Sequence, residues 1–214
     1  MNKYYPIMLD IKEKKCVVIG GGNIAYRKVI SLLEAGANVT VISKEINEDI
    51  RLLLKDQVVE CIEEKYDFKY INDCYLVYAA TDDKEVNELV YSQCSEKNIL
   101  VNVVDKPEIC NFIVPSKLQR GDLTIAISTN GKSPMLSRKI RQDLEKVYDN
   151  RYELFLDITG EVRKEAFKVL INGKKRSEFY NKIIYSNYID RLACEDKQKI
   201  YIEIMNILHE YGNE

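Results

Sequence analysis

A glycine-rich segment is the first part of the sequence whose residue types and spacing could do chemistry. Gly20-Gly21-Gly22-Asn23-Ile24-Ala25 fits the pattern G-x-G-x-x-A, directly after the apolar run at residues 16–19 and directly before a segment of helical period. In a strand–turn–helix context, such glycines permit a tight turn and bring backbone amides close to a phosphate. The segment predicts dinucleotide binding, and the alternative is a glycine-rich turn that holds no ligand.

The residues after the next expected strand bear on which dinucleotide is bound. In NAD-binding folds this strand commonly ends in an acidic residue that accepts hydrogen bonds from the ribose hydroxyls. Here residues 39–42 run into Ser43-Lys44-Glu45. Ser43 could bond a ribose hydroxyl, Glu45 could replace the acid one turn later, and Lys44 could accommodate a 2′-phosphate. The residues alone leave NAD and NADP open.

Two isolated polar residues are candidates for chemistry. Asp105 follows the expected strand 100–104, and catalytic groups gather at the carboxyl ends of parallel strands. A turn-forming aspartate before Lys106-Pro107 is the alternative, which these residues alone favour. His209 is the only histidine, and its place in the last helical segment predicts a surface residue. We therefore expect no histidine-based metal centre and no metal ligands.

A basic segment stands out from an otherwise balanced chain. Residues 115–141 carry a local charge of +5, whereas the whole chain has a formal charge of -2. The segment includes Ser128, Thr129 and Lys132 at a strand-to-helix junction, where hydroxyls, amides and a helix N-terminus could bind an anion. The alternative is a solvated helix face beside an ordinary capped loop. The basic residues are Lys117, Arg120, Lys132, Arg138, Lys139 and Arg141.

Alternating strands and helices must position these residues. The apolar patterns predict strands at 16–19, 39–42, 58–62, 75–80 and 100–104, separated by helical patterns that include residues 45–55 and 84–97. This alternation predicts an α/β fold with a Rossmann-like, doubly wound parallel sheet over residues 1–111.

The pattern changes after Asp105. Expected strands at 112–114 and 123–128 follow one another without a helix, and Ser133-Pro134 then begins a helix that runs to about Val147. We expect a small α+β module over 112–148. From residue 149 the chain is Tyr-rich and helical, with breaks at Asn172-Gly173 and near Glu195, which predicts a helical domain over 149–214.

Composition excludes several classes of protein. A length of 214 residues suits one large or two modest domains, and the near-neutral charge argues against a nucleic-acid coat. No apolar run is long enough to span a membrane, and the N-terminus lacks the apolar core of a signal peptide, so we expect a cytoplasmic protein. The six cysteines form no C-x-x-C pair, which argues against zinc or a disulfide framework.

Four segments carry a family resemblance. GGGNIAYRK, AATDDKEVN, NVVDKPEICNFIVPS and RGDLTIAISTNGKSPMLSRKIR, in this order, resemble the precorrin-2 dehydrogenase family, which also forms the N-terminal part of siroheme synthases. The resemblance runs from about Tyr5 to Leu144. It implies NAD-dependent oxidation of precorrin-2 to sirohydrochlorin by a homodimer, with 112–148 as the dimerisation module. Since the sequence ends at Glu214, we expect the methyltransferase part of fused siroheme synthases to be absent.

The resemblance also implies roles for individual residues. Asp105 matches the aspartate of the NVVD motif, which is regarded as catalytically important, and this reverses the preference for a turn residue. Ser128, Thr129 and Lys132 match the loop at the tetrapyrrole cleft, and a substrate with eight carboxylates would explain the basic segment. The phosphates of NAD would be held by Gly20, Gly22, Asn23 and Ile24, with Ser43, Lys44 and Glu45 near the adenosine ribose.

Two other functions stay open at this point. Some members of the family also insert ferrous iron into sirohydrochlorin, so a bifunctional enzyme is one alternative. A module that senses NAD without catalysis is another, although it leaves Asp105 and the basic loop without a role.

Overall fold

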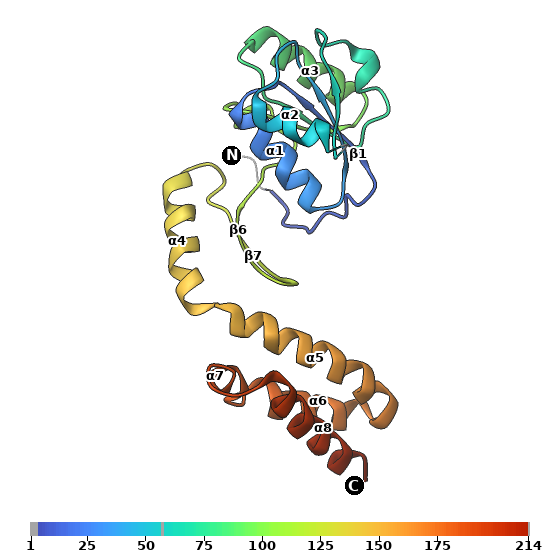
Figure 1. Ribbon diagram of the computed structural model, residues 1–214, viewed down its shortest axis with the longest axis vertical. Helices are drawn as coiled ribbons and strands as arrows, with labels where there is room; N and C mark the ends of the chain where they lie inside the picture. Colours follow the sequence, from blue (N-terminus) through green and yellow to red (C-terminus); the bar gives the residue numbers. More distant parts are fainter. Residues whose placement is uncertain (1–3, 57, 214) are drawn as a thin grey trace. The chain divides into compact units, whose positions relative to one another are not determined.

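The computed structural model describes residues 4–56 and 58–213, and its chain forms two compact units (Figure 1). The first unit ends at Val114 and the second begins at Pro115. The expected boundary lay three residues earlier, after Asn111. The difference arises because Phe112 packs against Tyr78 in the first unit, with ring centroids 5.6 Å apart.

The first unit contains a five-stranded sheet in which every pairing is parallel. Its order is β3-β2-β1-β4-β5, so the order reverses at β1, where β2 and β4 lie on opposite sides. This confirms the predicted doubly wound fold. A reversal of this kind opens a crevice at the carboxyl ends of the two central strands. The strands are β1 (Lys15–Ile19), β2 (Asn38–Ile42), β3 (Glu60–Ile62), β4 (Leu76–Ala79) and β5 (Leu100–Val103).

Helices cover both faces of this sheet (Figure 1). Val18 and Tyr78 face the side of α1 and α2, whereas Val17 and Val77 face the side of α3. Because both faces are buried, the strands read as continuous apolar runs rather than as alternating patterns. The helices are α1 (Asn23–Glu34), α2 (Glu48–Lys55) and α3 (Lys84–Glu96), with single 3-10 turns at Phe68–Tyr70 and Pro107–Ile109.

One asparagine completes the hydrogen bonding along the outer edge of β5. The Asn111 backbone N–H donates to the Val101 carbonyl at 3.2 Å, and its side-chain Oδ1 accepts from the Val101 N–H at 2.8 Å. The Asn111 side-chain amide also donates to the Ile99 carbonyl, and Asn102 Nδ2 donates to the Phe112 carbonyl, both at 3.0 Å. The segment after β5 is thereby held against the sheet edge.

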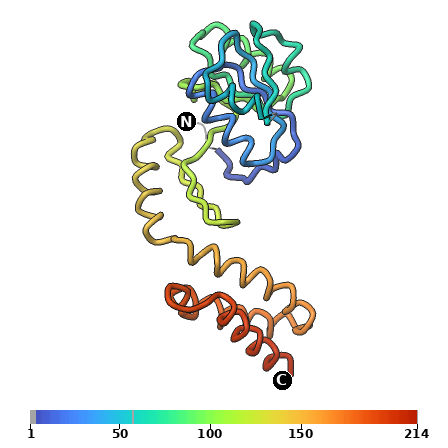
Figure 2. Tube along the Cα trace, viewed as in Figure 1, coloured from blue at the N-terminus to red at the C-terminus, as the bar shows by residue number. Residues whose placement is uncertain are grey.

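The second unit begins with an antiparallel hairpin (Figure 2). The prediction of a strand at 112–114 was wrong, because these apolar residues have no regular structure and instead pack within the first unit. The strand lies in the polar stretch that follows, where only Leu118 is buried. The elements are β6 (Ser116–Arg120), β7 (Leu123–Ile127), α4 (Pro134–Val147), α5 (Asn150–Val169), α6 (Gly173–Ile184), α7 (Tyr188–Arg191) and α8 (Lys197–Asn213).

The last four helices share an apolar core. Ile158 on α5, Phe179 on α6 and Ile204 on α8 are fully buried in it. The predicted break at Asn172-Gly173 is confirmed, since the Asn172 side chain accepts from the Lys174 and Lys175 N–H groups and caps α6. The expected separation of residues 149–214 as a domain of their own stays a prediction.

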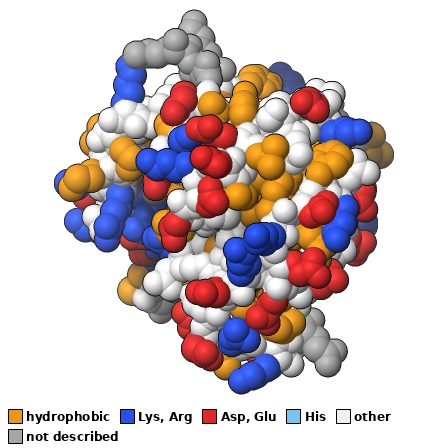
Figure 3. All heavy atoms as spheres, turned by 90° about the horizontal axis from the view of Figure 1, so that it is seen from above, with side chains coloured by type: hydrophobic (Ala, Val, Ile, Leu, Met, Phe, Trp, Pro, Cys, Tyr) orange, Lys and Arg blue, Asp and Glu red, His pale blue; other side chains and the backbone are white. Residues whose placement is uncertain are grey.

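The surface and the cysteines agree with the composition. Acidic and basic side chains are interspersed on the face shown in Figure 3. Burial raises the pKa of Cys16 and Cys74 to about 11 and that of Cys94 to about 12, so these thiols serve as small apolar side chains. Within residues 4–56 and 58–213, no helix combines the length and apolarity that a membrane crossing requires.

Candidate active site

The first two glycines of the phosphate turn are required by packing. Gly20 has a φ of +124°, and a Cβ there would lie 2.2 Å from the carbonyl oxygen of Ala80 at the end of β4. A Cβ on Gly21 would lie 1.9 Å from the carbonyl oxygen of Glu45. The turn after β1 is therefore pressed between the end of β4 and the loop that follows β2.

Gly22 differs from both neighbours, because nothing lies within 4 Å of the position its Cβ would take. Its φ of -88° and ψ of -172° suit any residue, so the fold itself does not need glycine there. The open space borders the N-terminus of α1, where amide groups can bind phosphate oxygens. A pyrophosphate fits this position, and a side chain would occupy its place.

The N-terminus of α1 has no side-chain cap and no acidic residue in its first turn. In contrast, the N-termini of α2, α3 and α4 are capped by Asn47, Asp83 and Ser133. The first amides of a helix have no partner within the helix and normally take one from such a cap. The uncapped α1 terminus therefore offers its first-turn amides to an anionic ligand, which fits a nicotinamide dinucleotide.

The loop expected near the adenosine ribose is bonded to the phosphate turn. Ser43 Oγ donates to the Glu45 carbonyl at 2.7 Å, while the side chains of Lys44 and Glu45 are exposed. The backbone N–H of Asn47 donates to the Gly21 carbonyl, and its Nδ2 donates to Asn23 Oδ1, both at 2.9 Å. The structure thus brings the two predicted parts of the cofactor site together.

Asn47 is a positioning residue that sequence reasoning missed. It caps α2 by accepting from the Ile50 N–H at 3.0 Å, and it also orients Asn23. The expected helix therefore begins at Glu48 rather than at residue 45. An asparagine followed by Glu48 and Asp49 is a recognisable helix start, and this signal could have identified it.

The loop after β4 forms the other wall of the crevice and was also missed. Asn87 is buried, and its Nδ2 donates to the Thr81 carbonyl at 2.9 Å while its Oδ1 accepts from the Thr81 hydroxyl at 3.0 Å. Asp83 caps α3 through the Glu85 and Val86 N–H groups. These bonds fix the backbone beside Gly20 at the reversal of strand order.

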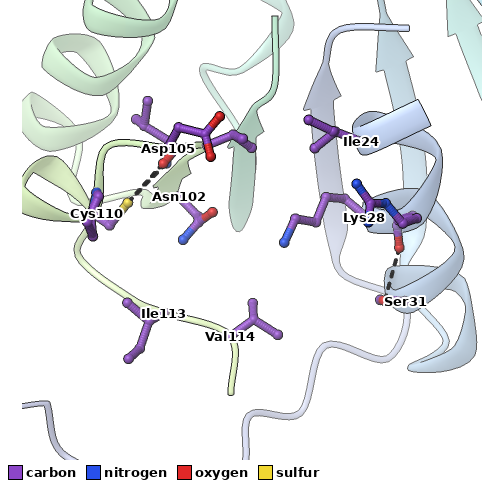
Figure 4. Close-up of a pocket in the computed structure, with 12 residues that line it drawn as sticks. Ile24, Lys28, Ser31, Asn102, Asp105, Cys110, Ile113 and Val114 are labelled. Carbon is purple, nitrogen blue, oxygen red and sulfur yellow. Dashed lines mark hydrogen bonds between the residues drawn. The ribbon is translucent and has the colours of Figure 1, made fainter. Parts of the chain in front are cut away.

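Asp105 lies directly beyond β5 with an exposed side chain and a φ of +62°. Aspartate tolerates this left-handed conformation better than most residues, and such conformations cluster at functional sites. Asp105 lines an open pocket of about 440 Å³ in the first unit, together with Ile24 of the phosphate turn (Figure 4). The structure therefore places the predicted catalytic residue and a predicted cofactor residue on the same pocket.

The other pocket residues come from α1 and from the segment after β5. Arg27, Lys28 and Ser31 continue the face of α1 that begins at Ile24, while Asn102 and Cys110 lie opposite (Figure 4). Cys110 Sγ lies within hydrogen-bonding distance of the Val103 carbonyl, and burial raises the pKa of this thiol. The pocket is thus lined by a cationic helix face on one side and by a rigidly bonded loop on the other.

The predicted substrate loop lies in the second unit, where its hydroxyls bond to its own backbone. Ser128 Oγ accepts from the Asn130 N–H at 3.0 Å, and Thr129 Oγ1 accepts from the Ser133 N–H at 3.1 Å. Ser133 Oγ caps α4 by accepting from the Leu136 N–H at 3.2 Å. Lys132 is exposed. The loop is an ordered capping structure that presents Lys132 to solvent.

Part of the expected basic segment is neutralised within α4. Lys139 pairs with Asp143 at 2.7 Å, and Arg141 pairs with Glu145. Both acids lie just beyond the segment on which the local charge was counted, and pairs four residues apart on a helix are neighbours. Lys139 and Arg141 are therefore paired with acidic residues of the same helix.

Comparisons with known proteins follow the division of the chain. Residues 7–116, slightly more than half of it, match the family model described as putative NAD(P)-binding. Residues 120–146 match the model of the central part of sirohaem biosynthesis proteins. The chain is 34% identical to a siroheme synthase from Photobacterium profundum over 95% of its own length and 44% of that protein. A siroheme synthase from Buchnera aphidicola is also 34% identical, over 99% of this chain and 44% of that protein.

A solved structure corresponds to nearly the whole chain. The chain is similar to SirC, precorrin-2 dehydrogenase, with a TM-score of 0.79 and 28% sequence identity over 97% of this chain and 100% of that one. The curated siroheme synthases are longer, and this chain spans less than half of their length. The family expected from the sequence motifs is thus confirmed: the chain belongs to the putative NAD(P)-binding family that includes the precorrin-2 dehydrogenases and the N-terminal part of siroheme synthases.

Proposed function

We propose that this chain catalyses the NAD-dependent dehydrogenation of precorrin-2 to sirohydrochlorin. The observation that carries the proposal is the correspondence with SirC, precorrin-2 dehydrogenase, which extends over all of that chain. The open space at Gly22 and the uncapped N-terminus of α1 support dinucleotide binding independently. A function that only sensed NAD would give the pocket beside Asp105 no role.

In the proposed mechanism, the substrate loses a hydride and a proton. A bound nicotinamide dinucleotide supplies the hydride acceptor. Asp105 either accepts the proton or orients the substrate, because its carboxylate is exposed on a pocket that also contains Ile24. The left-handed backbone conformation at Asp105 sets the direction in which its side chain leaves the main chain. The phosphates would be held at Gly20, Gly22, Asn23 and Ile24, and the ribose at Ser43, Lys44 and Glu45. The residues proposed to bind the tetrapyrrole are Ser128, Thr129 and Lys132.

The preference for NAD over NADP rests on the family resemblance. Lys44 and Glu45 are both exposed at the proposed ribose site. Lys44 would attract the 2′-phosphate of NADP, and Glu45 would repel it. We expect a lower Michaelis constant for NAD than for NADP. A lower Michaelis constant for NADP would mean that Lys44, rather than Glu45, determines which dinucleotide is preferred.

The function is tested by anaerobic incubation of the protein with precorrin-2 and NAD while NADH absorbance is followed. We expect equal amounts of NADH and sirohydrochlorin. Ferrous ion added afterwards tests the alternative of a bifunctional enzyme, since metal insertion consumes sirohydrochlorin without forming further NADH. Binding of NAD without any NADH formation would instead support the sensing module.

Asp105→Asn tests the proposed catalytic residue. Asparagine also tolerates a left-handed backbone, so the fold and both ligands should be retained, whereas a positioned acid or base contributes on the order of a hundredfold or more to the rate. Single-turnover oxidation measures this loss. Asp82→Asn is the matched control, because it changes an exposed aspartate that follows the neighbouring strand β4. A wild-type rate in Asp105→Asn would return Asp105 to a turn residue.

We also infer that the chain forms a homodimer through the module that contains α4. The family resemblance suggests it, and α4 exposes apolar side chains at Met135, Leu136 and Val147, with Met135 84% exposed. Large exposed apolar side chains are common where proteins associate. Light scattering coupled to size exclusion should give twice the monomer mass. Met135→Lys should shift it toward the monomer.

A further inference from the structure

Lys28 has no role in the site assigned so far, yet it lines the pocket beside Asp105 (Figure 4). It stands on one face of α1 with Ile24, Arg27 and Ser31. This spacing of three, four and seven residues is that of one helix face. The pocket therefore extends from the phosphate turn along the side of α1.

The ammonium group of Lys28 rests on an aromatic ring and not on a carboxylate. Its Nζ lies 5.0 Å from the centroid of the Tyr78 ring, which is itself fixed edge-on by Phe112. Burial lowers the pKa of Lys28, and the neighbouring charge of Arg27 lowers it further. Among the residues that the structure describes, no acidic side chain forms an ion pair with Lys28, whereas Lys15 and Lys106 pair with Asp73 and Glu88.

A half-buried cation without an anionic partner is costly, and such groups gather at binding sites. Two other polar side chains on the pocket wall are already bonded: Asn102 Nδ2 donates to the Phe112 carbonyl, and the Ser31 hydroxyl donates to the Arg27 carbonyl at 3.0 Å. The remaining two, Arg27 and Asp105, are exposed, and Asp105 carries a carboxylate that cannot donate to an anion. Lys28 is thus the partly desolvated donor that a ligand in this pocket would meet.

The dinucleotide is not the ligand that reaches Lys28. Its phosphates belong at Gly22, and Lys28 lies five residues after Asn23, about 7.5 Å further along the helix axis at a rise of 1.5 Å per residue. A dinucleotide bound to a doubly wound sheet runs across the carboxyl ends of its strands. Lys28 lies instead down the side of α1, away from that edge. An anionic group at Lys28 must come from the second substrate.

We propose that Lys28 binds a carboxylate arm of the tetrapyrrole inside this pocket. The inference rests on the proposed function, in which the second substrate carries eight carboxylates. Ile113 and Val114 supply apolar surface on the same pocket for the carbon skeleton of one ring (Figure 4). The volume of about 440 Å³ lies in the lower part of the usual range for small-molecule sites, which suits one edge of a macrocycle.

Lys28→Met tests this proposal, because methionine keeps an unbranched chain over Tyr78 and removes the charge. Affinity for sirohydrochlorin, titrated anaerobically by absorbance, should fall about tenfold, the size of one charge-assisted hydrogen bond. The affinity should also become less sensitive to salt, since one ion pair is lost. The Michaelis constant for precorrin-2 should rise while kcat and the affinity for NAD stay within about twofold. Lys28→Arg should recover most of the binding.

Lys14→Met is the matched control. Lys14 also stands over a tyrosine ring, 5.7 Å from the centroid of Tyr75, but before β1 and away from the pocket. The Lys14→Met protein should bind sirohydrochlorin with the same affinity as the wild type. Wild-type affinity and salt dependence in Lys28→Met, or a loss confined to NAD, would overturn the proposal while leaving the dehydrogenase activity intact. If the wild-type protein itself neither bound sirohydrochlorin nor formed NADH, the proposed function would fail first.

Discussion

Each unit contains a strand that passes through a tight turn into a helix, but the two turns use the helix N-terminus differently. Before α1, Gly22 provides no cap and leaves open space next to the first amides. Before α4, Ser133 caps the helix, and Thr129 accepts from the Ser133 N–H. A serine cap stabilises a helix N-terminus by about 1 kcal/mol relative to alanine and by a few tenths of a kcal/mol relative to glycine, whereas an uncapped terminus keeps its amides for a ligand.

This difference separates two ways to hold an anion. At α1 the ligand is expected to meet backbone amides, so its binding depends on shape and on the absence of side chains. At the loop before α4 the N–H groups of Asn130, Ser133 and Leu136 already bond to side-chain hydroxyls, so an anion there would depend more on side chains such as Lys132. The first kind of site suits an invariant group such as a pyrophosphate. The second suits a substrate with many carboxylates at variable positions.

Among the substitutions that test the difference between the two helix N-termini, Gly22→Val should have the largest effect. The valine side chain would fill the space reserved for phosphate, so affinity for NAD should fall on the order of a hundredfold or more, while the fold is kept. Titration of nicotinamide fluorescence measures the affinity, and circular dichroism verifies the fold. Gly21→Val serves as a contrast, because its Cβ would collide with the Glu45 carbonyl and unfold the turn. A folded Gly22→Val protein with normal affinity would remove the phosphate assignment.

Gly22→Asp should convert the α1 terminus into one like that of α4. The backbone at Gly22 already suits a cap, so the aspartate should stabilise α1 by about 0.5–1 kcal/mol and raise Tm by about 2 °C. The same carboxylate would occupy the amides and repel phosphate, so NAD affinity should drop more than tenfold. Calorimetry and fluorescence titration give the two values. If the variant were stabilised but bound NAD normally, the first-turn amides of α1 would not be the groups that bind the phosphates.

Ser133→Ala makes the reverse change at α4. Loss of the bond to the Leu136 N–H should cost about 1 kcal/mol of unfolding free energy. Urea denaturation followed by circular dichroism measures it, and NAD affinity serves as the internal control because the α1 terminus is unaltered. A change in NAD affinity as large as the change in stability would mean that the two termini are not independent.

Lys132→Ala should have the smallest effect, because an exposed lysine contributes about 0.2–1 kcal/mol to an ion pair. Affinity for sirohydrochlorin should fall about threefold at low salt and hardly at all at high salt, while NAD binding is unchanged. Absorbance titrations at two ionic strengths provide this test. An equal loss for both ligands would show that the substitution disturbs the fold.

The parallel sheet was predictable because its strands are buried on both faces. Runs such as residues 16–19 and 39–42 leave little doubt when helical patterns lie between them, and the G-x-G-x-x-A turn marks the end of β1. The hairpin was harder to predict. Strand β6 buries only Leu118, so its sequence has no apolar alternation, while the apolar residues 112–114 imitate a strand without forming one.

The candidate site was predicted in its parts but not in its connections. Glycine spacing pointed to Gly22, whereas the position of Asp105 after a strand favoured it only once the family resemblance was added. Lys28 escaped notice, because nothing in its sequence context reveals that its ammonium group lies over Tyr78, fifty residues later. Asn47 was missed although the helix start after it could have identified it, and its bond to Asn23 joins loops that are separate in the sequence. Asn87 was missed because its burial and its bonds to Thr81 depend on how the loop after β4 folds back onto α3.

The bonds that Asn111 makes along β5 have a consequence for how copies of the chain can meet. An unpaired edge strand is a template on which another chain can add a strand, and this is a common route to aggregation. Asn111 bonds both the N–H and the carbonyl of Val101, so this part of the edge offers nothing for an incoming strand to bond. Addition of a strand from another molecule is therefore blocked at this position of β5.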